Sequence, residues 1–236
     1  MGVTVDTPIH VREPLRFQQP RDAGMTWFAL PSTTVTVIIN LAEPFGGLPG
    51  AFIAGPTDRG TVVDQHGEID CLDLKLTPLG AYRLFGVPMN ELVNQIVDLA
   101  DVARLRPDRL REDLARLTEE GPEPAPEVTH VWRRLRKAHG NIPITELAGE
   151  VGWSRRHLVN RFHAQIGLPP KTVARILRFE ELLRRLPTTR IAEAATTCGY
   201  YDQAHMNRDF REFAGTTPGE YLARFPSVQY PWVPAT

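Results

Sequence analysis

The sequence predicts an α+β protein in which a small β-sheet or barrel domain with helices precedes an all-α domain. Three observations support this prediction. The stretch 144–170 returns in degraded form at 191–218, as expected for a duplicated structural unit. Runs of β-branched residues stop before Pro78, after which the apolar spacing is helical. Charge also divides the chain, because residues 1–127 hold 11 Lys and Arg against 19 Asp and Glu, whereas residues 128–236 hold 16 against 9.

The first part of the chain indicates strands followed by helices. A proline-punctuated segment up to Asp22 is expected to be a strand or an extended arm. Five further strands are predicted where β-branched and apolar runs are separated by Gly, Pro and Asp, at 25–30, 33–41, 50–55, 60–65 and 69–76. Helical spacing then predicts a helix from Pro78, another over 90–99, and one helix or a pair over 105–117.

A proline-rich segment separates the two parts. Residues 121–126 are Gly, Pro, Glu, Pro, Ala and Pro, a composition that favours an extended, semi-rigid connection. The expected division is a β-rich domain, a linker, a helical domain and an irregular tail, over 1–120, 121–126, 127–225 and 226–236. The acidic first domain is not expected to touch DNA, whereas the basic second half suits phosphate neutralisation.

The helical domain is expected to open with an amphipathic helix that ends at Gly140. Its apolar face consists of Val128, Val131, Trp132 and Leu135. Its exposed face carries Arg133, Arg134, Arg136 and Lys137. These cations are either an ordinary solvated face or phosphate contacts.

The first copy of the repeat predicts two short helices across a tight turn. The first helix has four apolar residues at helical spacing, namely Ile144, Leu147, Ala148 and Val151. This helix is expected to end at Gly152, because glycine readily adopts the positive φ that a tight turn can require. Ser154 can cap a second helix that directs Leu158 and Phe162 inward. The combination is a helix-turn-helix.

The second copy repeats this construction with one residue inserted in its turn. Ile191 and Gly199 follow 47 residues after their counterparts in the first copy. Asp202, Met206 and Phe210 follow 48 residues after theirs, so the inserted residue lies in the turn.

The helix faces that the apolar pattern leaves free are polar and basic. The first copy leaves Arg155, Arg156, Val159, Asn160 and His163 outside the core, and the second leaves Gln203, His205, Arg208 and Arg211. Arg, Asn and Gln can form bidentate hydrogen bonds to purine edges, and a helix fits the major groove. A single polar residue of this kind is as often part of an ordinary solvated helix face as a DNA contact. Two successive helices with the same construction favour DNA recognition.

These motifs resemble the paired helix-turn-helix domain of AraC-type (AraC/XylS-like) transcription regulators. The resemblance covers 127–225 and rests on residues at set spacing in both copies: Gly152, Trp153, Ser154, Leu158 and Phe162, then Gly199, Tyr200, Tyr201, Asp202, Met206, Arg208, Phe210, Gly215, Thr217, Pro218 and Tyr221. It implies two recognition helices in successive major-groove segments, joined by a long rigid helix to which residues 170–186 correspond.

The resemblance also implies which side chains contact DNA. The base-reading positions fall on Arg156, Val159, Asn160, Gln203, Ala204, His205 and Arg208. Val159 and Ala204 offer only apolar contact, such as to a thymine methyl group. Phosphate contacts that set the register are expected from Arg155, Arg161, Lys171 and Arg175.

Two features of the second copy depart from the family pattern. Its first helix ends in Thr196, Thr197 and Cys198, a run with poor helix propensity. Asp209 is expected to place a negative charge near the DNA side, whereas family members often carry an Asp at the position of Asp202 as a helix cap. The second copy is therefore expected to bind DNA more weakly or less specifically than the first.

The first domain has a looser resemblance. Ala54-Gly55-Pro56, Arg59 and the segments 74–81 and 84–88 look like the N-terminal domain of a poorly characterised group of AraC-like regulators. In the wider family, a β-rich domain at this place commonly binds a small-molecule effector or mediates dimerisation, so both roles stay open. The expected partners are double-stranded DNA, RNA polymerase, an effector and a second copy of the chain.

A metal-dependent enzyme or a thiol sensor is the alternative function of the first domain. His66 with Glu68, Asp70 and Asp73 suggests a metal site, but a cupin-type site has a paired His-x-His arrangement that this stretch lacks. Cys71 lies in an alternating run without a neighbouring His or Arg to lower its pKa, so burial is expected. Without a Gly-rich phosphate loop or a serine nucleophile elbow, no enzyme activity, metal or cofactor is predicted.

The chain is expected to be cytoplasmic and free of membrane contact. The sequence has no run of 18 apolar residues, and its first residues have neither the basic flank nor the apolar core of an export signal. Cys71 and Cys198 fall in different predicted domains, which argues against a disulfide and agrees with a reducing compartment.

Overall fold

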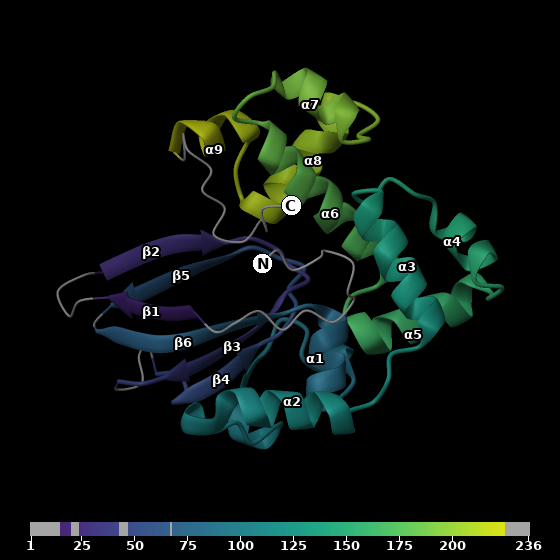
Figure 1. Cartoon of the computed structure of the whole chain (residues 1–236). Coiled ribbons are helices and arrows are strands. Elements are labelled where there is room, and N and C mark those ends of the chain that lie inside the picture. Colours follow the sequence, from purple (N-terminus) through teal and green to yellow (C-terminus); the bar gives the residue numbers. More distant parts are fainter. Residues whose placement is uncertain (1–14, 20–23, 43–46, 67, 225–236) are drawn as a thin grey trace.

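The computed structural model describes residues 15–19, 24–42, 47–66 and 68–224 (Figure 1). It confirms the α+β class, with antiparallel sheets in the first part of the chain and helices in the second. The predicted tail after residue 225 and most of the N-terminal arm lie outside the described residues. Among the described residues, no helix combines the length and apolar character needed to cross a membrane.

The strands form two antiparallel sheets. The larger sheet has the order β1-β6-β3-β4-β7, with bounds Leu15–Gln19, Ile69–Leu76, Val35–Asn40, Ala51–Ala54 and Ile96–Asp98. The smaller sheet pairs β2 (Gly24–Ala29) with β5 (Thr61–His66). The β-branched segment that becomes β3 lies between β6 and β4, where its alternate residues are buried.

One face of the larger sheet is covered by α1 (Pro78–Phe85) and α2 (Leu110–Glu120) (Figure 1). The strand alternation directs Val37 and its cross-strand partner Leu74 to this face, where both are buried with Leu84 of α1. The side chain of Thr77 caps α1 by accepting a hydrogen bond from the backbone N–H of Gly80.

The predicted helix over 90–99 is wrong. The chain forms two short 3-10 helices on either side of β7, η1 (Met89–Glu91) and η2 (Leu99–Asp101). Asn94 has a φ of +56°, and its backbone N–H donates to the carbonyl of Pro56 at 2.9 Å, which is incompatible with a continuous helix. Residues 96–98 pair with β4 instead, so tertiary strand pairing decides the structure here and not the helical spacing of the apolar residues.

The second part of the chain is helical. Its elements are α3 (Pro126–Lys137), α4 (Ile144–Glu150), α5 (Arg155–Ile166), α6 (Pro170–Arg185), α7 (Ile191–Thr197), α8 (Gln203–Ala214) and α9 (Pro218–Arg224). The core joins Trp132 of α3, Phe162 of α5, Phe179 of α6 and Phe210 of α8, all of which are almost fully buried. The apolar face predicted for the opening helix is confirmed, and the predicted long linker helix is α6.

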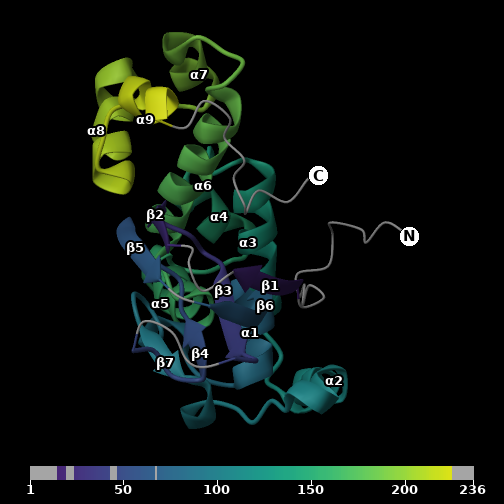
Figure 2. The same cartoon turned by 90° about the vertical axis from the view of Figure 1, so that its left-hand side faces the viewer.

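The two parts of the chain pack against each other. Helix α1 and η1 contact α5, and Leu79 of α1 belongs to the hydrophobic core of the helical part. In both orientations, β2 and β5 lie next to the lower end of α8 (Figures 1 and 2). The β-rich part therefore reaches both copies of the helical repeat.

Candidate nucleic-acid interface

The first helix-turn-helix consists of α4, α5 and the turn between them. Gly152 has a φ of +68°, as the sequence predicted, and the backbone N–H of Trp153 donates to the carbonyl of Ala148 at 3.0 Å. Ser154 is the N-cap of α5, where its side chain accepts a hydrogen bond from the N–H of His157 at 3.2 Å. The local residues therefore fix the start and direction of α5.

The second helix-turn-helix, α7 and α8, has the same construction. Asp202 caps α8, with its carboxylate accepting a hydrogen bond from the N–H of His205 at 2.6 Å. Gly199 has a φ of +76°, and a Cβ at this position would lie 2.0 Å from Oδ1 of Asn141. A larger residue here would be strained by the positive φ and would also displace Asn141, which donates from Nδ2 to the carbonyl of Cys198.

Helix α5 presents a polar face with free donors. Four of its predicted DNA contacts are exposed, namely Arg155, Arg156, Asn160 and Arg161, and Val159 between them is half-buried. Within the described part of the chain, none of these five side chains forms an ion pair or a hydrogen bond. Leu158 and Phe162 are fully buried on the opposite face. The apolar contacts hold the helix while the polar side chains remain available.

Helix α8 presents a smaller and less basic face. Gln203, Ala204 and Arg208 are exposed, whereas His205 is half-buried and its ring packs edge-on against Tyr200 at 5.3 Å. Asn207 is also half-buried on α8, although it was not among the predicted DNA contacts. With the offset of 48 residues between the copies, Asn207 is the counterpart of Val159. Aligning the two copies would therefore have added Asn207 to the predicted contacts.

The cations expected on the linker helix differ in their surroundings. Lys171 is exposed at the start of α6. Arg175 instead donates from Nη2 to Asp209 Oδ1 at 2.8 Å and to Glu212 Oε2 at 2.5 Å, and its guanidinium lies 4.8 Å from the centre of the Phe213 ring. The hydrogen bond to Glu212 is the main cause of a raised pKa at Arg175. A phosphate contact from Arg175 stays a prediction, and it requires these ion pairs to open.

The expectation that Asp209 places a charge near the DNA side is wrong. Its side chain is only 4% exposed and faces α6, where it pairs with Arg175. The counterpart of Asp209 in the first copy is Arg161, which is exposed. Equivalent positions of the two copies therefore differ in role, because the carboxylate on α8 is buried against Arg175 of α6, whereas the guanidinium on α5 faces solvent.

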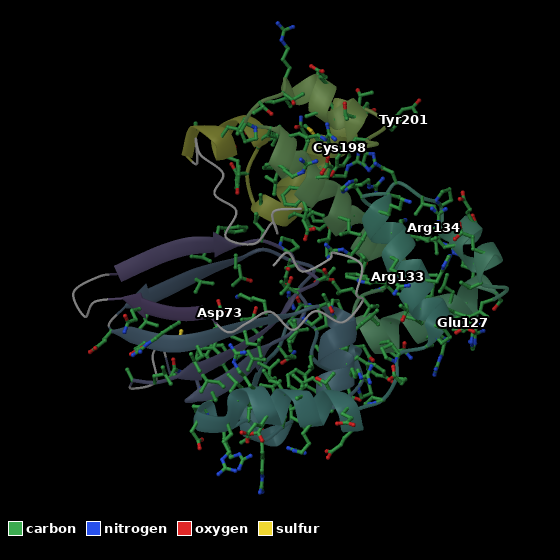
Figure 3. The ribbon with its side chains drawn as sticks, in the orientation of Figure 1. Asp73, Glu127, Arg133, Arg134, Cys198 and Tyr201 are labelled. Carbon is green, nitrogen blue, oxygen red and sulfur yellow. The ribbon has the colours of Figure 1, made fainter. Side chains whose placement is uncertain are left out.

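The basic residues of α3 do not form a uniformly solvated face. Arg134 is half-buried and donates from Nη2 to Glu150 Oε1 of α4 at 2.7 Å. This hydrogen bond, and after it the one with His130, lowers the pKa of Glu150 to about 2. Arg133, Arg136 and Lys137 are exposed, and Figure 3 labels Arg133 beside Arg134. Arg134 thus joins α3 to the first helix-turn-helix, and only its neighbours remain candidates for contact with an external anion.

Comparison with known proteins identifies the helical part of the chain. Residues 128–224 match the family model described as a helix-turn-helix domain. They are a helix-turn-helix domain of the AraC type. Residues 15–98 match the model of a domain of unknown function (DUF6597), which spans most of the β-rich part.

Two transcription regulators and one solved DNA-binding domain are similar to part of this chain. The uncharacterized HTH-type transcriptional regulator YbfI of Bacillus subtilis (strain 168) is 32% identical over 36% of this chain and 32% of its own length. The HTH-type transcriptional regulator MtrA of Neisseria gonorrhoeae is 27% identical over 39% of this chain and 31% of its own length. The solved DNA-binding domain of AdpA, a global transcriptional factor in complex with a target DNA, is 24% identical, covers 46% of this chain and 100% of its own, and has a TM-score of 0.41. The chain thus spans about a third of the length of these two curated relatives.

The cysteines on which a thiol sensor would depend are buried. Cys71 on β6 and Cys198 after α7 are both unpaired, and burial raises the pKa of each thiol to about 11. A thiolate is the reactive form of cysteine, so neither residue is suited to sensing by its own nucleophilicity. Among the described residues, no group of three His, Cys, Asp or Glu side chains is placed to hold a metal, and the side chain of His66 lies outside that set.

We expect both thiols of the native protein to react slowly with a colorimetric disulfide reagent, because each must be uncovered before it can ionise. In denaturant both should react at the rate of an unhindered thiol. The variants Cys71→Ser and Cys198→Ser show which of the two thiols gives each phase of the reaction. A Cys71 that reacts in the native protein as fast as in denaturant would restore the thiol-sensor alternative.

Proposed function

We propose that the protein is a sequence-specific transcription regulator that reads two successive major-groove segments of double-stranded DNA with α5 and α8. The observation that supports this proposal most strongly is the exposed, unpaired polar face of α5, repeated in smaller form on α8. Each recognition helix begins at a side-chain cap and is anchored by buried apolar residues on its other side. Such a helix can enter a groove without rearrangement.

The length of α6 suits this mode of binding. A helix of 16 residues is roughly 24 Å long at a rise of about 1.5 Å per residue. This length is of the same order as one turn of DNA, about 34 Å. Buried residues along α6, among them Ile176 and Phe179, fix the helix in the core of both units.

The roles of the side chains follow their chemistry. Arg156 and Asn160 on α5, with Gln203, His205 and Arg208 on α8, are the candidates for hydrogen bonds to base edges. Val159 and Ala204 offer apolar contact. Arg155, Arg161 and Lys171 are the candidates for phosphate contacts that set the register.

Selection of binding sites from random duplex DNA by the full-length protein tests the proposed function. We expect a site with two elements whose centres lie about one helical turn apart, and an affinity that falls steeply with salt. Scrambled DNA of the same length is the control. If no sequence is enriched, with or without added metabolites, the protein is not a sequence-specific regulator.

The β-rich part, for which we propose the range 1–120, would control DNA binding from the ends of both recognition helices. At α5, a Cβ on Gly167 would lie 2.8 Å from Cγ of Pro56 and 3.0 Å from the carbonyl oxygen of Met89. At α8, a Cβ on Gly60 would lie 2.5 Å from the carbonyl oxygen of Phe213. These close approaches support a role of the β-rich part as a bridge, by which we mean its two contacts with the ends of α5 and α8. The bridge would hold the two helix-turn-helix units in one relative position.

A signal can act through this bridge. A small molecule that binds the β-rich domain, or dimerisation of that domain, would change the relative position of α5 and α8 if it moved η1 or β5. RNA polymerase is the expected partner of the DNA-bound protein, and the cytoplasm is its expected compartment. The segment 121–126 would connect the two domains, and α3 begins at its last residue.

Gly60→Ala is expected to loosen the bridge. The added methyl group would lie 2.2 Å from the ring of Phe28 and 2.5 Å from the backbone of α8, so β5 and α8 must move apart. We expect a loss of about 1 to 2 kcal/mol in the free energy of unfolding, as for other overpacked sites. The variant should also tolerate a wider range of spacings between the two DNA elements.

Gly149→Ala is the matched control, because a Cβ at this exposed helical position would meet no atom within 4 Å apart from its chain neighbours and the backbone of its own helix. Binding to a series of sites with altered spacing, together with denaturant unfolding, measures both effects. A Gly60 variant that matches the Gly149 variant in stability and in spacing preference would show that the bridge does not constrain α8.

A further inference from the structure

The two turns of the helix-turn-helix domain can be aligned residue by residue from their hydrogen bonds. The backbone N–H of Trp153 donates to the carbonyl of Ala148 at 3.0 Å, and that of Tyr200 donates to Ala195 at 3.0 Å. Each aromatic ring packs edge-on against the histidine at the third position of the following helix, at 4.5 Å in the first copy and 5.3 Å in the second. Tyr200 therefore has the structural role of Trp153.

This alignment identifies Tyr201 as the inserted residue of the second turn. In the first copy the N-cap Ser154 follows Trp153 directly, whereas in the second copy Tyr201 lies between Tyr200 and the N-cap Asp202. Tyr200 is 4% exposed, but Tyr201 is 94% exposed and projects from the domain next to the start of α8 (Figure 3). The core therefore makes no use of the second aromatic ring.

The charges around the two helix starts differ. The first turn of α5 contains Arg155 and Arg156, both exposed. The same positions of α8 are Gln203 and Ala204, and the N-cap is a carboxylate. A recognition helix is flanked by phosphates where it enters the groove, so α8 has no cation in its first turn for that contact.

We propose that Tyr201 is a DNA-backbone contact of the second helix-turn-helix, in which its hydroxyl donates to a phosphate beside the start of α8. A tyrosine suits this position because its hydroxyl is a donor without charge and its ring can pack on a deoxyribose. It would take the place of the phosphate contact proposed for Arg155 in the first copy. The inference rests on the proposed function, since it assigns one contact of the DNA complex.

The test uses the full-length protein and the site selected by the wild type. Tyr201→Ala is expected to lower affinity about tenfold, whereas Tyr201→Phe, which removes only the hydroxyl, should account for about half of that loss on a logarithmic scale. Sequence preference and the salt dependence of binding should stay unchanged, because the contact is to the backbone and carries no charge. Thermal unfolding should be unaffected in both variants, since the side chain is exposed.

A modified DNA locates the contact. Methylphosphonates placed one at a time along the second element remove single phosphate charges. With the methylphosphonate at one particular position, the affinity of the wild type should fall to that of Tyr201→Phe on unmodified DNA. The affinity of Tyr201→Phe should not fall further on the same modified DNA. Wild-type affinity in Tyr201→Ala, or losses that add at every phosphate, would overturn the inference. A failure of the proposed function is distinguishable, because the wild type would then select no site.

Discussion

Replacing Asp209 with alanine is expected to lower the free energy of unfolding by about 3 kcal/mol, because it breaks an ion pair whose carboxylate is buried. The Asp209 side chain is 4% exposed, and Oδ1 accepts two hydrogen bonds from Arg175, from Nε at 3.3 Å and from Nη2 at 2.8 Å. The pair joins α6 to α8. Its loss should therefore weaken the second helix-turn-helix more than the first.

Glu212→Ala provides the matched control for this prediction. Glu212 contacts the same guanidinium from the same helix, but its side chain is 52% exposed, so its removal should cost less than about 1 kcal/mol. Urea unfolding of both variants measures the difference. Equal losses in the two variants would mean that burial of Asp209 adds nothing to the strength of this contact.

Features that depend on neighbouring residues could be predicted from the sequence. The positive φ angles of Gly152 and Gly199 and the caps at Ser154 and Asp202 are properties of four or five consecutive residues. The apolar spacing that places Phe162 in the core is equally local. Because the second copy repeats these signals, the helix-turn-helix pair and the exposed face of α5 were both predictable.

Features that depend on contacts between distant segments could not be predicted. The spacing of Leu92, Ile96 and Leu99 suits a helix, yet Ile96 lies in an edge strand because β4 is available to pair with it. Charged residues were expected to face solvent, but Asp209 and Arg134 each have a partner on another helix. The packing of η1 against α5 likewise joins residues more than 60 positions apart, and no local pattern reveals it.

Arg156→Ala is expected to relax the base preference at one position of the first DNA element and to weaken binding by about 1 to 3 kcal/mol. Arg156 is exposed at the second position of α5 and, among the described residues, has no protein partner, so its guanidinium is free to form a bidentate contact with a guanine. Binding to the selected site and to its single-base variants measures both effects. On DNA sites in which the preferred base has already been replaced, Arg156→Ala should cause no further loss of affinity.

Arg155→Ala is the control for the Arg156 prediction, because the neighbouring side chain is equally exposed but is expected to contact a phosphate. Its removal should weaken binding to all sequences alike and reduce the salt slope by about one. If Arg155→Ala changes base preference and Arg156→Ala changes only the salt slope, the two roles are exchanged, and α5 is rotated in the groove relative to the register proposed. If neither variant changes base preference, recognition by the first copy depends on Asn160 and its neighbours at the centre of the helix.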